Sequence, residues 1–416
     1  MKTRKTIVLI SLMIAGEMVF MLPFVVSRIF RPTFLKVFDV INLELGLAFS
    51  VYGMVAMVSY FAGGPIADRY SPRKLMTFSL VVTAVGGIIM GFIPSLFTLT
   101  LLYAFWGLST ILLYWSASIK AIRAYGGEQT QGRAFGMVDA GRGFVAALIA
   151  SLSVLILNSL LPVHADNASI DDLSKALGQI IFIFVGLVIA SAVLVWFAFP
   201  KTLPTTGDTR RKLSLEGVKQ AMKKKSIWLQ ALIVLCAYVG YKCTDDFSLY
   251  ASDVMQMNDV NAAHVGTISF WVRPFAALAA GMLGDRIMHS KMAIYCFLIM
   301  LSGSVIISSG ILKPGIEWVV ILTIASTSVG IYGLRGIYFA LFQESKIPLV
   351  YIGSAAGLIS VIGYTPDVFM GPLMGYVLDR SPGALGHQHL FGILAAFAII
   401  GLFATIMFKR NSLPKV

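Results

Sequence analysis

The amino-acid sequence predicts an all-α membrane protein whose twelve transmembrane helices form two pseudo-symmetric six-helix bundles. Composition is the first observation, because 57% of the 416 residues are hydrophobic and 13% are charged, whereas soluble domains carry about 25% charged residues. The mean hydropathy is +0.83. The second observation is that runs of roughly 20 apolar residues, enough to cross a hydrocarbon core of about 30 Å, recur from end to end. The third is that the two halves of the chain echo each other in sequence.

Six apolar runs fill residues 1–200, which are expected to form the N-terminal bundle. The first run follows the basic start MKTRK and continues past Glu17 without a small-residue cleavage site, so it predicts an uncleaved helix rather than a signal peptide. Charged residues, glycines and prolines separate the runs. The expected spans are 6–29, 43–63, 75–94, 98–120, 134–161 and 177–199.

A polar stretch at 201–226 is expected to be a basic cytoplasmic linker. Its segment SLEGVKQAMKKKS has the pattern of a short amphipathic helix lying on the membrane surface. Residues 227–416 are expected to form the C-terminal bundle. Its spans are predicted at 228–251, 262–284, 292–312, 317–341, 350–376 and 388–408.

The net charge of +13 is distributed unevenly between the two sides that alternating spans define. The side that carries both termini holds most of the Lys and Arg residues, including the cluster from Lys201 to Lys225. The opposite side holds only Arg31, Lys36, Lys175, Lys313 and Arg380. This asymmetry predicts that both termini are cytoplasmic. It also explains the basic charge with the lipid bilayer as the partner and without nucleic acid.

Other residue types argue against several chemistries. Cys236, Cys243 and Cys296 fall inside expected spans, so neither a disulfide nor a zinc site is predicted. No Walker A, HExxH or GxSxG pattern is present, and we expect no enzyme activity, no metal and no cofactor. The histidines are expected in loops or at span ends, which does not favour a buried histidine proton relay. They are His164, His264, His289, His387 and His389.

Two related loops carry the strongest motif. GGPIADRYSPRK lies between the second and third expected spans, and GMLGDRIMHSK lies between the eighth and ninth. A glycine there permits close helix contact, the aspartate can face a helix N-terminus, and the arginines can tie the loop to the opposite half. The residues expected to form this gating loop are Gly64, Asp68, Arg69, Arg73, Lys74, Gly281, Asp285 and Arg286.

The first loop resembles the G-x-x-x-D-R-x-x-R-[RK] signature of the major facilitator superfamily, and the second resembles its degenerate repeat. This resemblance implies a secondary transporter that works by alternating access, in which the loop latches the outward-facing state. The stretch from Phe24 to Lys74 is most similar to the organophosphate and organic-anion branch, which implies cavity cations at Arg28 and Lys242. The sequence departs from that branch at Asp245 and Asp246, which follow Lys242 closely.

Ionisable residues inside the expected spans are the candidate site residues, because each costs at least about 2.5 to 3.5 kcal/mol at the bilayer centre unless it is paired or functional. Those expected to bind an anionic substrate are Arg28, Lys242, Arg273 and Arg335. The alternative for Arg28 and Lys242 is snorkelling to the interface. The alternative for Arg273 is an ion pair with Asp139, Asp367 or Glu17.

The remaining charges are expected to couple protons or to form ion pairs. Glu17 has no basic residue within a turn, so it is either a proton site or the partner of a distant arginine. Asp139 and Arg142 share a helix face and are expected to pair, for a structural or a gating purpose. The full set is Glu17, Asp139, Arg142, Asp245, Asp246 and Asp367.

Two aromatic residues, Trp271 and Tyr332, are expected to contact substrate, with ordinary packing as the alternative. Pro23, Pro274 and Pro366 are expected to interrupt helices beside charged positions. Together these features predict a monomeric carrier in a bacterial inner membrane that moves a small organic anion, coupled to protons or to antiport. A solute sensor built like a transporter and a drug or lipid efflux carrier are the alternatives.

Overall fold

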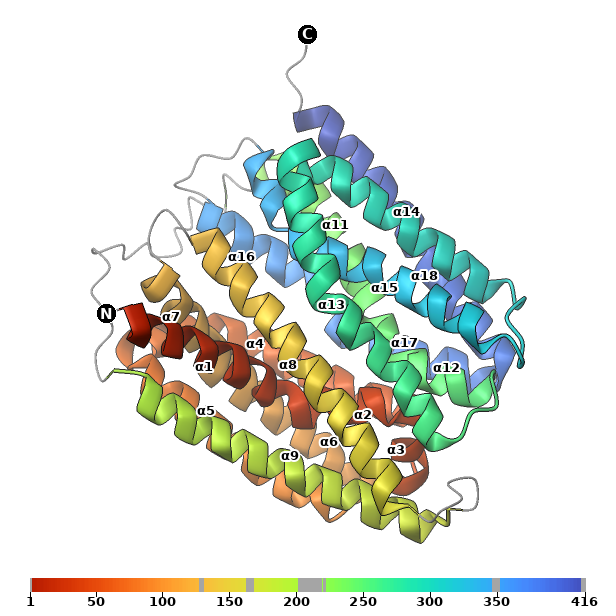
Figure 1. The fold of residues 1–416 in the computed structure, drawn as a ribbon. Coiled ribbons are helices and arrows are strands. Elements are labelled where there is room, and N and C mark those ends of the chain that lie inside the picture. Colours follow the sequence, from red (N-terminus) through yellow and green to blue (C-terminus); the bar gives the residue numbers. More distant parts are fainter. Residues whose placement is uncertain are drawn as a thin grey trace.

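The structure is a computed structural model that describes residues 2–126, 131–161, 168–200, 219, 222–345 and 352–412. Eleven helical segments in this part of the chain are long and apolar enough to cross a membrane. Two shorter helices that follow each other, α16 and α17, make the remaining crossing (Figure 1). The chain is therefore an all-helical, multi-pass membrane protein, and the predicted twelve-helix fold is confirmed.

The helices of the first half occupy the region predicted for the N-terminal bundle. They are α1 (Lys2–Phe20), the π-helix η1 (Met21–Val25), α2 (Val26–Ile29), α3 (Arg31–Phe38), α4 (Asn42–Arg69), α5 (Pro72–Gly91), α6 (Leu96–Trp106), the π-helix η2 (Gly107–Trp115), α7 (Ser116–Gly126), α8 (Gln131–Leu160) and α9 (Ile170–Ala198). The expected interruption at Pro23 takes the form of η1, since a proline inside a helix removes a hydrogen bond and crowds the preceding turn.

The second half follows the expected linker at 201–226, of which all but Lys219 and 222–226 lies outside the described residues. Its helices are α11 (Lys225–Cys243), the 3₁₀ turn η4 (Thr244–Asp246), α12 (Phe247–Asp253), α13 (Asp259–Ile287), α14 (His289–Ser308), α15 (Glu317–Ile337), the 3₁₀ turn η5 (Ala340–Gln343), α16 (Ile352–Gly363), α17 (Pro366–Arg380) and α18 (Ala384–Ser412).

The predicted span 350–376 is broken in the structure between α16 and α17. Pro366 is the first residue of α17, a position at which a proline is well accommodated because the first helical N–H has no intrahelical partner. Thr365, the residue before it, keeps helical backbone angles, and the break falls where Pro366 lacks the N–H that would continue the hydrogen bonds of α16. The expected interruption at Pro366 therefore ends one helix and starts the next. Pro274 lies inside α13, which continues through it.

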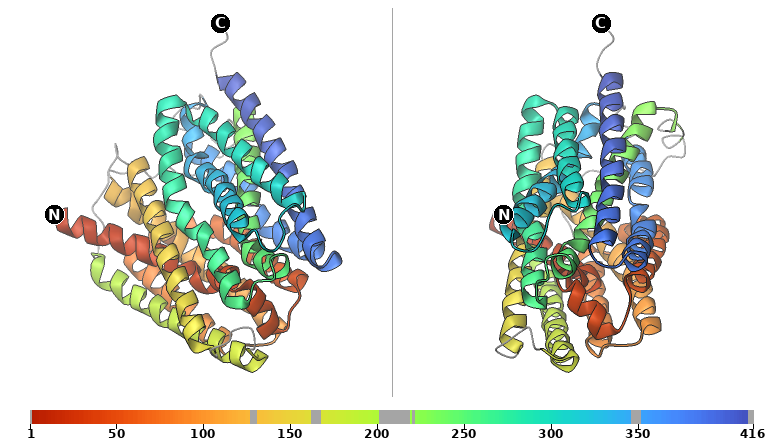
Figure 2. Two further views of the ribbon diagram at one scale, coloured as in Figure 1. Left: turned by 45° about the vertical axis from the view of Figure 1, so that its right-hand side comes forward. Right: turned by 90° about the vertical axis from the view of Figure 1, so that its right-hand side faces the viewer.

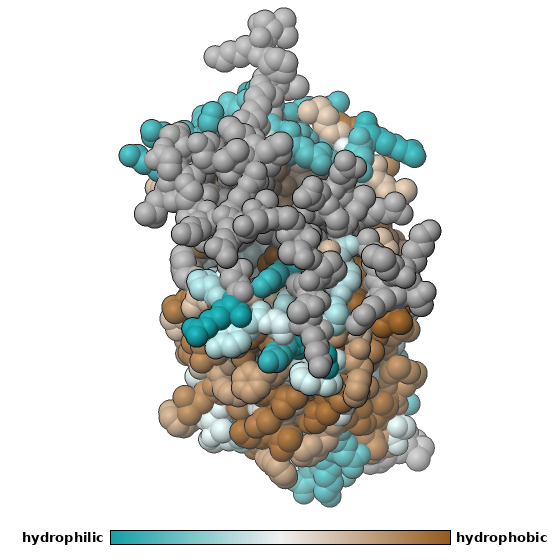
Figure 3. Space-filling model, turned by 90° about the vertical axis from the view of Figure 1, so that its left-hand side faces the viewer, coloured by the Kyte–Doolittle hydropathy of each residue, from teal (hydrophilic) through white to brown (hydrophobic). Residues whose placement is uncertain are grey.

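Apolar side chains cover the outer surface of the bundle as well as its interior. The exposed fractions of Phe197, Phe92 and Phe403 are 78%, 75% and 62%, values that suit contact with lipid rather than with water. Figure 3 shows hydrophobic side chains over much of the lower part of one face, with hydrophilic side chains at its lower edge and near its top.

The two halves diverge toward the end of the bundle that carries both chain termini, here called the terminal end, and converge at the opposite end, here called the far end (Figures 1 and 2). Polar contacts join the halves at the far end. Asp259 of α13 accepts hydrogen bonds from Lys36 Nζ at 2.8 Å and Thr33 Oγ1 at 2.9 Å. The backbone N–H of Leu43 donates to Asp379 at 2.7 Å.

Helices α4 and α17, one from each half, pack closely through glycines near the far end. A methyl group added to Gly46 would overlap the backbone of Gly371. A methyl group at Gly53 would lie 2.5 Å from the carbonyl oxygen of Asp367. Because only glycine lets two helix backbones approach this closely, the seam between α4 and α17 closes the far end of the bundle.

Candidate functional site

A cavity with about 830 Å³ of empty space, counted with its opening, lies between the two halves and is lined by helices of both. Its charged lining residues are Glu17, Arg28, Arg142, Lys242, Arg273, Arg335 and Asp367. Its aromatic lining residues are Phe20, Phe24, Tyr52, Tyr60, Trp115, Tyr238, Tyr241 and Tyr364. This mixture of convergent charges and aromatic rings inside an apolar bundle has the character of a site for a small polar ligand.

The first charge network, here the Glu17 network, contains Glu17, Asp139, Arg142 and Arg273. Arg273 of α13 reaches across to the first half, with Nη1 3.3 Å from Glu17 Oε1 and Nη2 3.3 Å from Asp139 Oδ1. Arg142 Nε lies 3.3 Å from Glu17 Oε2, and Arg142 Nη1 lies 3.7 Å from Asp139 Oδ1. The expected partners of Arg273 are thus Glu17 and Asp139, and Glu17 is the partner of distant arginines.

The second network, here the Asp245 network, contains Arg28, Lys242, Asp245, Asp367 and Tyr238. Arg28 Nε of α2 donates to Asp245 Oδ1 of η4, so this ion pair also joins the two halves. Lys242 Nζ lies 3.7 Å from Asp245 and 3.5 Å from Asp367. Tyr238 donates to Asp367 at 3.1 Å. Arg28 and Lys242 have exposed fractions of 3% and 2%, so the structure places both in the interior rather than in the snorkelling positions of the alternative.

Arg335 of α15 differs from the other cavity cations. Its guanidinium lies 3.7 Å from the centre of the Tyr241 ring, and its buried Nη1 has no hydrogen-bond partner. Among the described residues no carboxylate forms an ion pair with it, whereas each of the other cavity cations has at least one such partner. The described part of the cavity therefore offers one guanidinium that no carboxylate neutralises, next to an aromatic ring that holds it in place.

Tyrosines form much of the cavity wall, and sequence reasoning missed most of them. The rings of Tyr238 and Tyr241 lie 5.4 Å apart, and Tyr60 of the first half stacks on Tyr364 of the second at 6.4 Å. Tyr238, Tyr241 and Tyr52 were not predicted as site residues. The run YVGYKCTDDF contained the signal, since its two tyrosines are three residues apart and precede Lys242 on the same helix.

The two aromatic residues expected to contact substrate, Trp271 and Tyr332, are not among the described residues that line the cavity in this conformation. The indole N–H of Trp271 donates to Ser151 Oγ of α8 at 2.8 Å, and its ring packs edge-on against Phe144. Tyr332 is 1% exposed and lies behind Tyr241, with ring centres 6.3 Å apart. The sequence of one helix does not show which of its faces meets the cavity, because that depends on how the helix is rotated within the bundle.

Asp246 lies apart from the cavity and pairs with a histidine. His387 Nδ1 lies 2.7 Å from Asp246 Oδ2, and both side chains are fully buried. His387 lies at a span end, as expected, in the first turn of α18, but it is buried and paired with acids, which the sequence did not suggest. Asp246 of η4 and Asp253 of α12 pack against α18 and bury His387 inside the second half.

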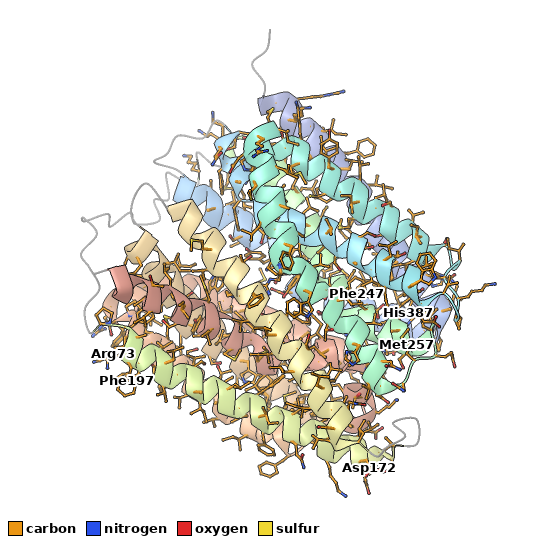
Figure 4. The ribbon with its side chains drawn as sticks, viewed as in Figure 1. Arg73, Asp172, Phe197, Phe247, Met257 and His387 are labelled. Carbon is orange, nitrogen blue, oxygen red and sulfur yellow. The ribbon has the colours of Figure 1, made fainter. Side chains whose placement is uncertain are left out.

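The two motif loops lie at the terminal end and make their contacts within their own halves. The guanidinium of Arg73 lies 4.1 Å from the Trp196 ring of α9 (Figure 4 labels Arg73 at this end). Asp285 Oδ1 lies 3.2 Å from His289 Nε2 at the start of α14. Exposed members of the loops are Gly64, Arg69, Lys74, Asp285 and Arg286, and the side chain of Asp68 lies outside the described residues.

The close helix contact expected at Gly64 and Gly281 is absent, because a methyl group at either would meet no atom within 4 Å. Gly63 is the tightly packed glycine of the first loop, where a methyl group would lie 2.5 Å from Ser116 Oγ. None of the ion pairs seen in the described residues joins a loop arginine to the opposite half, as expected when the halves stand apart at this end.

Comparison with known proteins was made on the whole chain. A family model described as Major Facilitator Superfamily matches residues 7–365. The inner membrane protein YihN of Escherichia coli K12 is 26% identical, covering 99% of this chain and 97% of that protein. The inner membrane protein YqcE of the same organism is 25% identical, covering 89% of this chain and 87% of that protein.

Two solved structures share the fold. A bacterial homologue of the human lysosomal transporter Spinster, in an inward-facing and unoccupied conformation, superposes with a TM-score of 0.73 at 14% identity, covering 99% of this chain and 98% of that one. The nucleoside transporter NupG gives a TM-score of 0.73 at 14% identity, covering 97% and 99%. At this level of identity the likeness concerns the fold alone.

Proposed function

The chain belongs to the Major Facilitator Superfamily and is a membrane transporter, and we propose that it is a secondary carrier that moves a small organic anion across a bacterial inner membrane by alternating access. The observation that carries the anionic substrate is Arg335, the cavity cation that forms no ion pair with a described carboxylate. The inner-membrane assignment is supported by the relatives YihN and YqcE. Both termini would then be cytoplasmic, as the charge asymmetry predicts.

The charge balance around the cavity supports an anion. Five cations line it, namely Arg28, Arg142, Lys242, Arg273 and Arg335. Four carboxylates neutralise them, namely Glu17, Asp139, Asp245 and Asp367. A single anionic group would complete the balance, with Arg335 as its bidentate ligand and with hydroxyls of the cavity tyrosines for the polar remainder of the solute.

Alternating access follows from the way the two ends are closed. The far-end contacts hold the halves together in the conformation seen here, and they must break when the far end opens. The motif loops would then come together and tie the terminal end. The cavity lies between the two sets of contacts, so that a bound solute would be exposed to one side at a time.

Coupling is proposed to act through the Glu17 network. Two arginines share two carboxylates there, so protonation of Glu17 would release one guanidinium for the substrate anion. A proton gradient imposed across proteoliposomes should then drive uptake of the anion. Uptake driven only by a second anion inside the vesicles would instead indicate antiport.

The substrate is tested with Arg335→Gln. A thermal-shift screen of carboxylates and phosphate esters on the purified protein would first identify ligands, since ligand binding raises the unfolding temperature. Loss of a charge-assisted hydrogen bond worth about 1.5 to 3 kcal/mol should weaken binding of the best ligand roughly 10- to 150-fold in Arg335→Gln. Uptake into proteoliposomes should fall in parallel.

The matched control is Arg380→Gln, because Arg380 is an exposed arginine at the far end of α17. This variant should keep the affinity and uptake of the natural protein. Unchanged affinity in Arg335→Gln, or a screen in which only cations bind, would contradict an anionic substrate at this site.

A further inference from the structure

The second half contains a buried group of ionisable side chains that does not line the cavity. His387 lies in the first turn of α18 and is fully buried, with Nδ1 2.7 Å from Asp246 Oδ2 and Nε2 3.2 Å from Asp253 Oδ2. Asp246 is also fully buried, whereas the side chain of Asp253 is 37% exposed. Figure 4 labels His387 at the far end of the second half.

This geometry fixes the number of protons that the three side chains hold. A neutral imidazole has one N–H donor, and its other nitrogen only accepts; an ionised carboxylate also only accepts. Both ring nitrogens of His387 face carboxylate oxygens at hydrogen-bond distance. One of the two contacts would therefore set a lone pair against a lone pair unless the group carries one proton more than a neutral imidazole and two carboxylates.

The side chains around this group determine how the additional proton is held and how it can leave. Asp253 and Tyr250 contact His387, and Cys243 lies close enough to Asp246 to interact with it electrostatically. Tyr250 presents its ring edge-to-face to His387 at 5.4 Å. Asp246 Oδ1 has no hydrogen-bond partner. Since Asp253 is partly exposed, the proton can exchange with solvent at the far end.

The same segment carries the contacts that close the far end. Asp245, next to Asp246 in η4, accepts from Arg28 of the first half. Ser248 Oγ of α12 donates to the backbone oxygen of Arg28 at 2.9 Å. The short helix α12 is therefore held on one side by the first half and on the other by His387 of α18.

We propose that His387, Asp246 and Asp253 form a proton-binding site that latches α12 to α18 and thereby keeps the far end closed. The proposal rests on the alternating access of the proposed function. The ligand is a single proton taken from the far-end solvent. When that proton leaves, a neutral His387 keeps one N–H, the contact with the more exposed Asp253 is lost to water, and α12 is freed to move with the opening of the far end.

The sign of the pH effect follows from linkage. The closed far end holds the additional proton and the open one does not, so raising the pH favours opening. One linked proton changes the ratio of open to closed molecules by at most about tenfold per pH unit. Acidic solvent at the far end would hold the carrier closed on that side.

The test measures the distance across the far end by electron spin resonance in nanodiscs. Spin labels on Ile170→Cys and Ile311→Cys place one label on each half, at side chains that are 63% and 62% exposed. The three native cysteines are buried, and the protein without the introduced pair reports their background. The open fraction should rise from about pH 5 to about pH 9, a range that contains the titration of histidine.

Two variants should lock the gate in opposite ways. In Asp253→Asn, the amide N–H₂ can donate to Nε2 of a neutral His387 while Nδ1–H still donates to Asp246, so the far end should stay closed at every pH. In His387→Gln, the imidazole that takes up the additional proton is missing, and the open fraction should be high and should not change between about pH 5 and about pH 9. His389→Gln, which alters an exposed histidine two residues away, should behave like the natural protein.

A pH-independent open fraction in the natural protein would overturn the latch. So would a pH response retained in His387→Gln, or an Asp253→Asn protein that opens as His387→Gln does, since a purely structural cluster would loosen in both. Uptake of the anion is measured on the same preparations. Uptake without a pH-dependent gate rejects the latch alone, whereas a pH-dependent gate without uptake of any solute rejects the proposed function alone.

Discussion

The described residues join the two halves differently at the two ends of the bundle: the far end has ion pairs and a glycine seam between the halves, and none of the described ion pairs joins them at the terminal end. At the far end, α4 packs on α17 through glycines, and Arg28 and Lys36 of the first half pair with Asp245 and Asp259 of the second. At the terminal end, Arg73 of the motif loop contacts only its own half, on Trp196. The difference indicates that the motif residues are reserved for the other conformation, whereas the far-end contacts stabilise this one.

The largest effect is expected where the far-end closure is most deeply buried. Asp245→Asn removes the carboxylate that pairs with Arg28, whose side chain is 3% exposed. A buried cation that loses its partner destabilises a protein by about 3 to 5 kcal/mol. Chemical unfolding in detergent should show that loss of free energy, together with a larger distance across the far end. Retention of full stability would mean that Arg28 is hydrated in this conformation.

An intermediate effect is expected at the glycine seam. Gly46→Ala inserts a methyl group against the backbone of Gly371 and should cost the closed far end about 1 to 3 kcal/mol through overpacking. The matched control is Gly64→Ala on the same helix, where a methyl group meets no atom within 4 Å. It should leave stability unchanged or raise it by about 0.4 to 1 kcal/mol. Equal destabilisation by both substitutions would refute the contrast between the ends.

The smallest effect is expected at the rim of the far end. The side chain of Lys36 is 48% exposed, and its ion pair with Asp259 is shielded by solvent. Lys36→Gln should therefore cost about 0.2 to 1 kcal/mol, and added salt should abolish the difference from the natural protein. A salt-independent loss of several kcal/mol would show that this pair belongs with the buried contacts.

The sequence alone predicted what is local along the chain. Apolar runs predicted the crossings, and the cost of a charge in lipid predicted that Arg28, Lys242 and Arg335 would turn toward an internal cavity, where the structure places them. The break before Pro366 was visible as an interruption, although it divides a helix that was predicted to be continuous.

What could not be predicted depends on which faces of distant helices meet. Arg273 and Glu17 are 256 residues apart, and both Asp139 and Asp367 were equally good partners for Arg273 on chemical grounds. The position of Trp271 against α8 could not be predicted, because the rotation of α13 about its axis is set by packing between helices. His387 lies at the start of α18, a span end as expected, but its burial depends on how η4 and α12 pack against that helix and could not be predicted.

The pairing of the cavity cations with the protein's own carboxylates has a consequence for the empty carrier. Asp245 pairs with Arg28, and Glu17 pairs with Arg273, so the protein's own carboxylates fill positions that a substrate anion could take. The empty carrier therefore has no uncompensated charge at these positions when its cavity changes from one side of the bilayer to the other. We therefore expect that the empty carrier can reorient without cargo, and that net transport in one direction needs no second solute to be carried back.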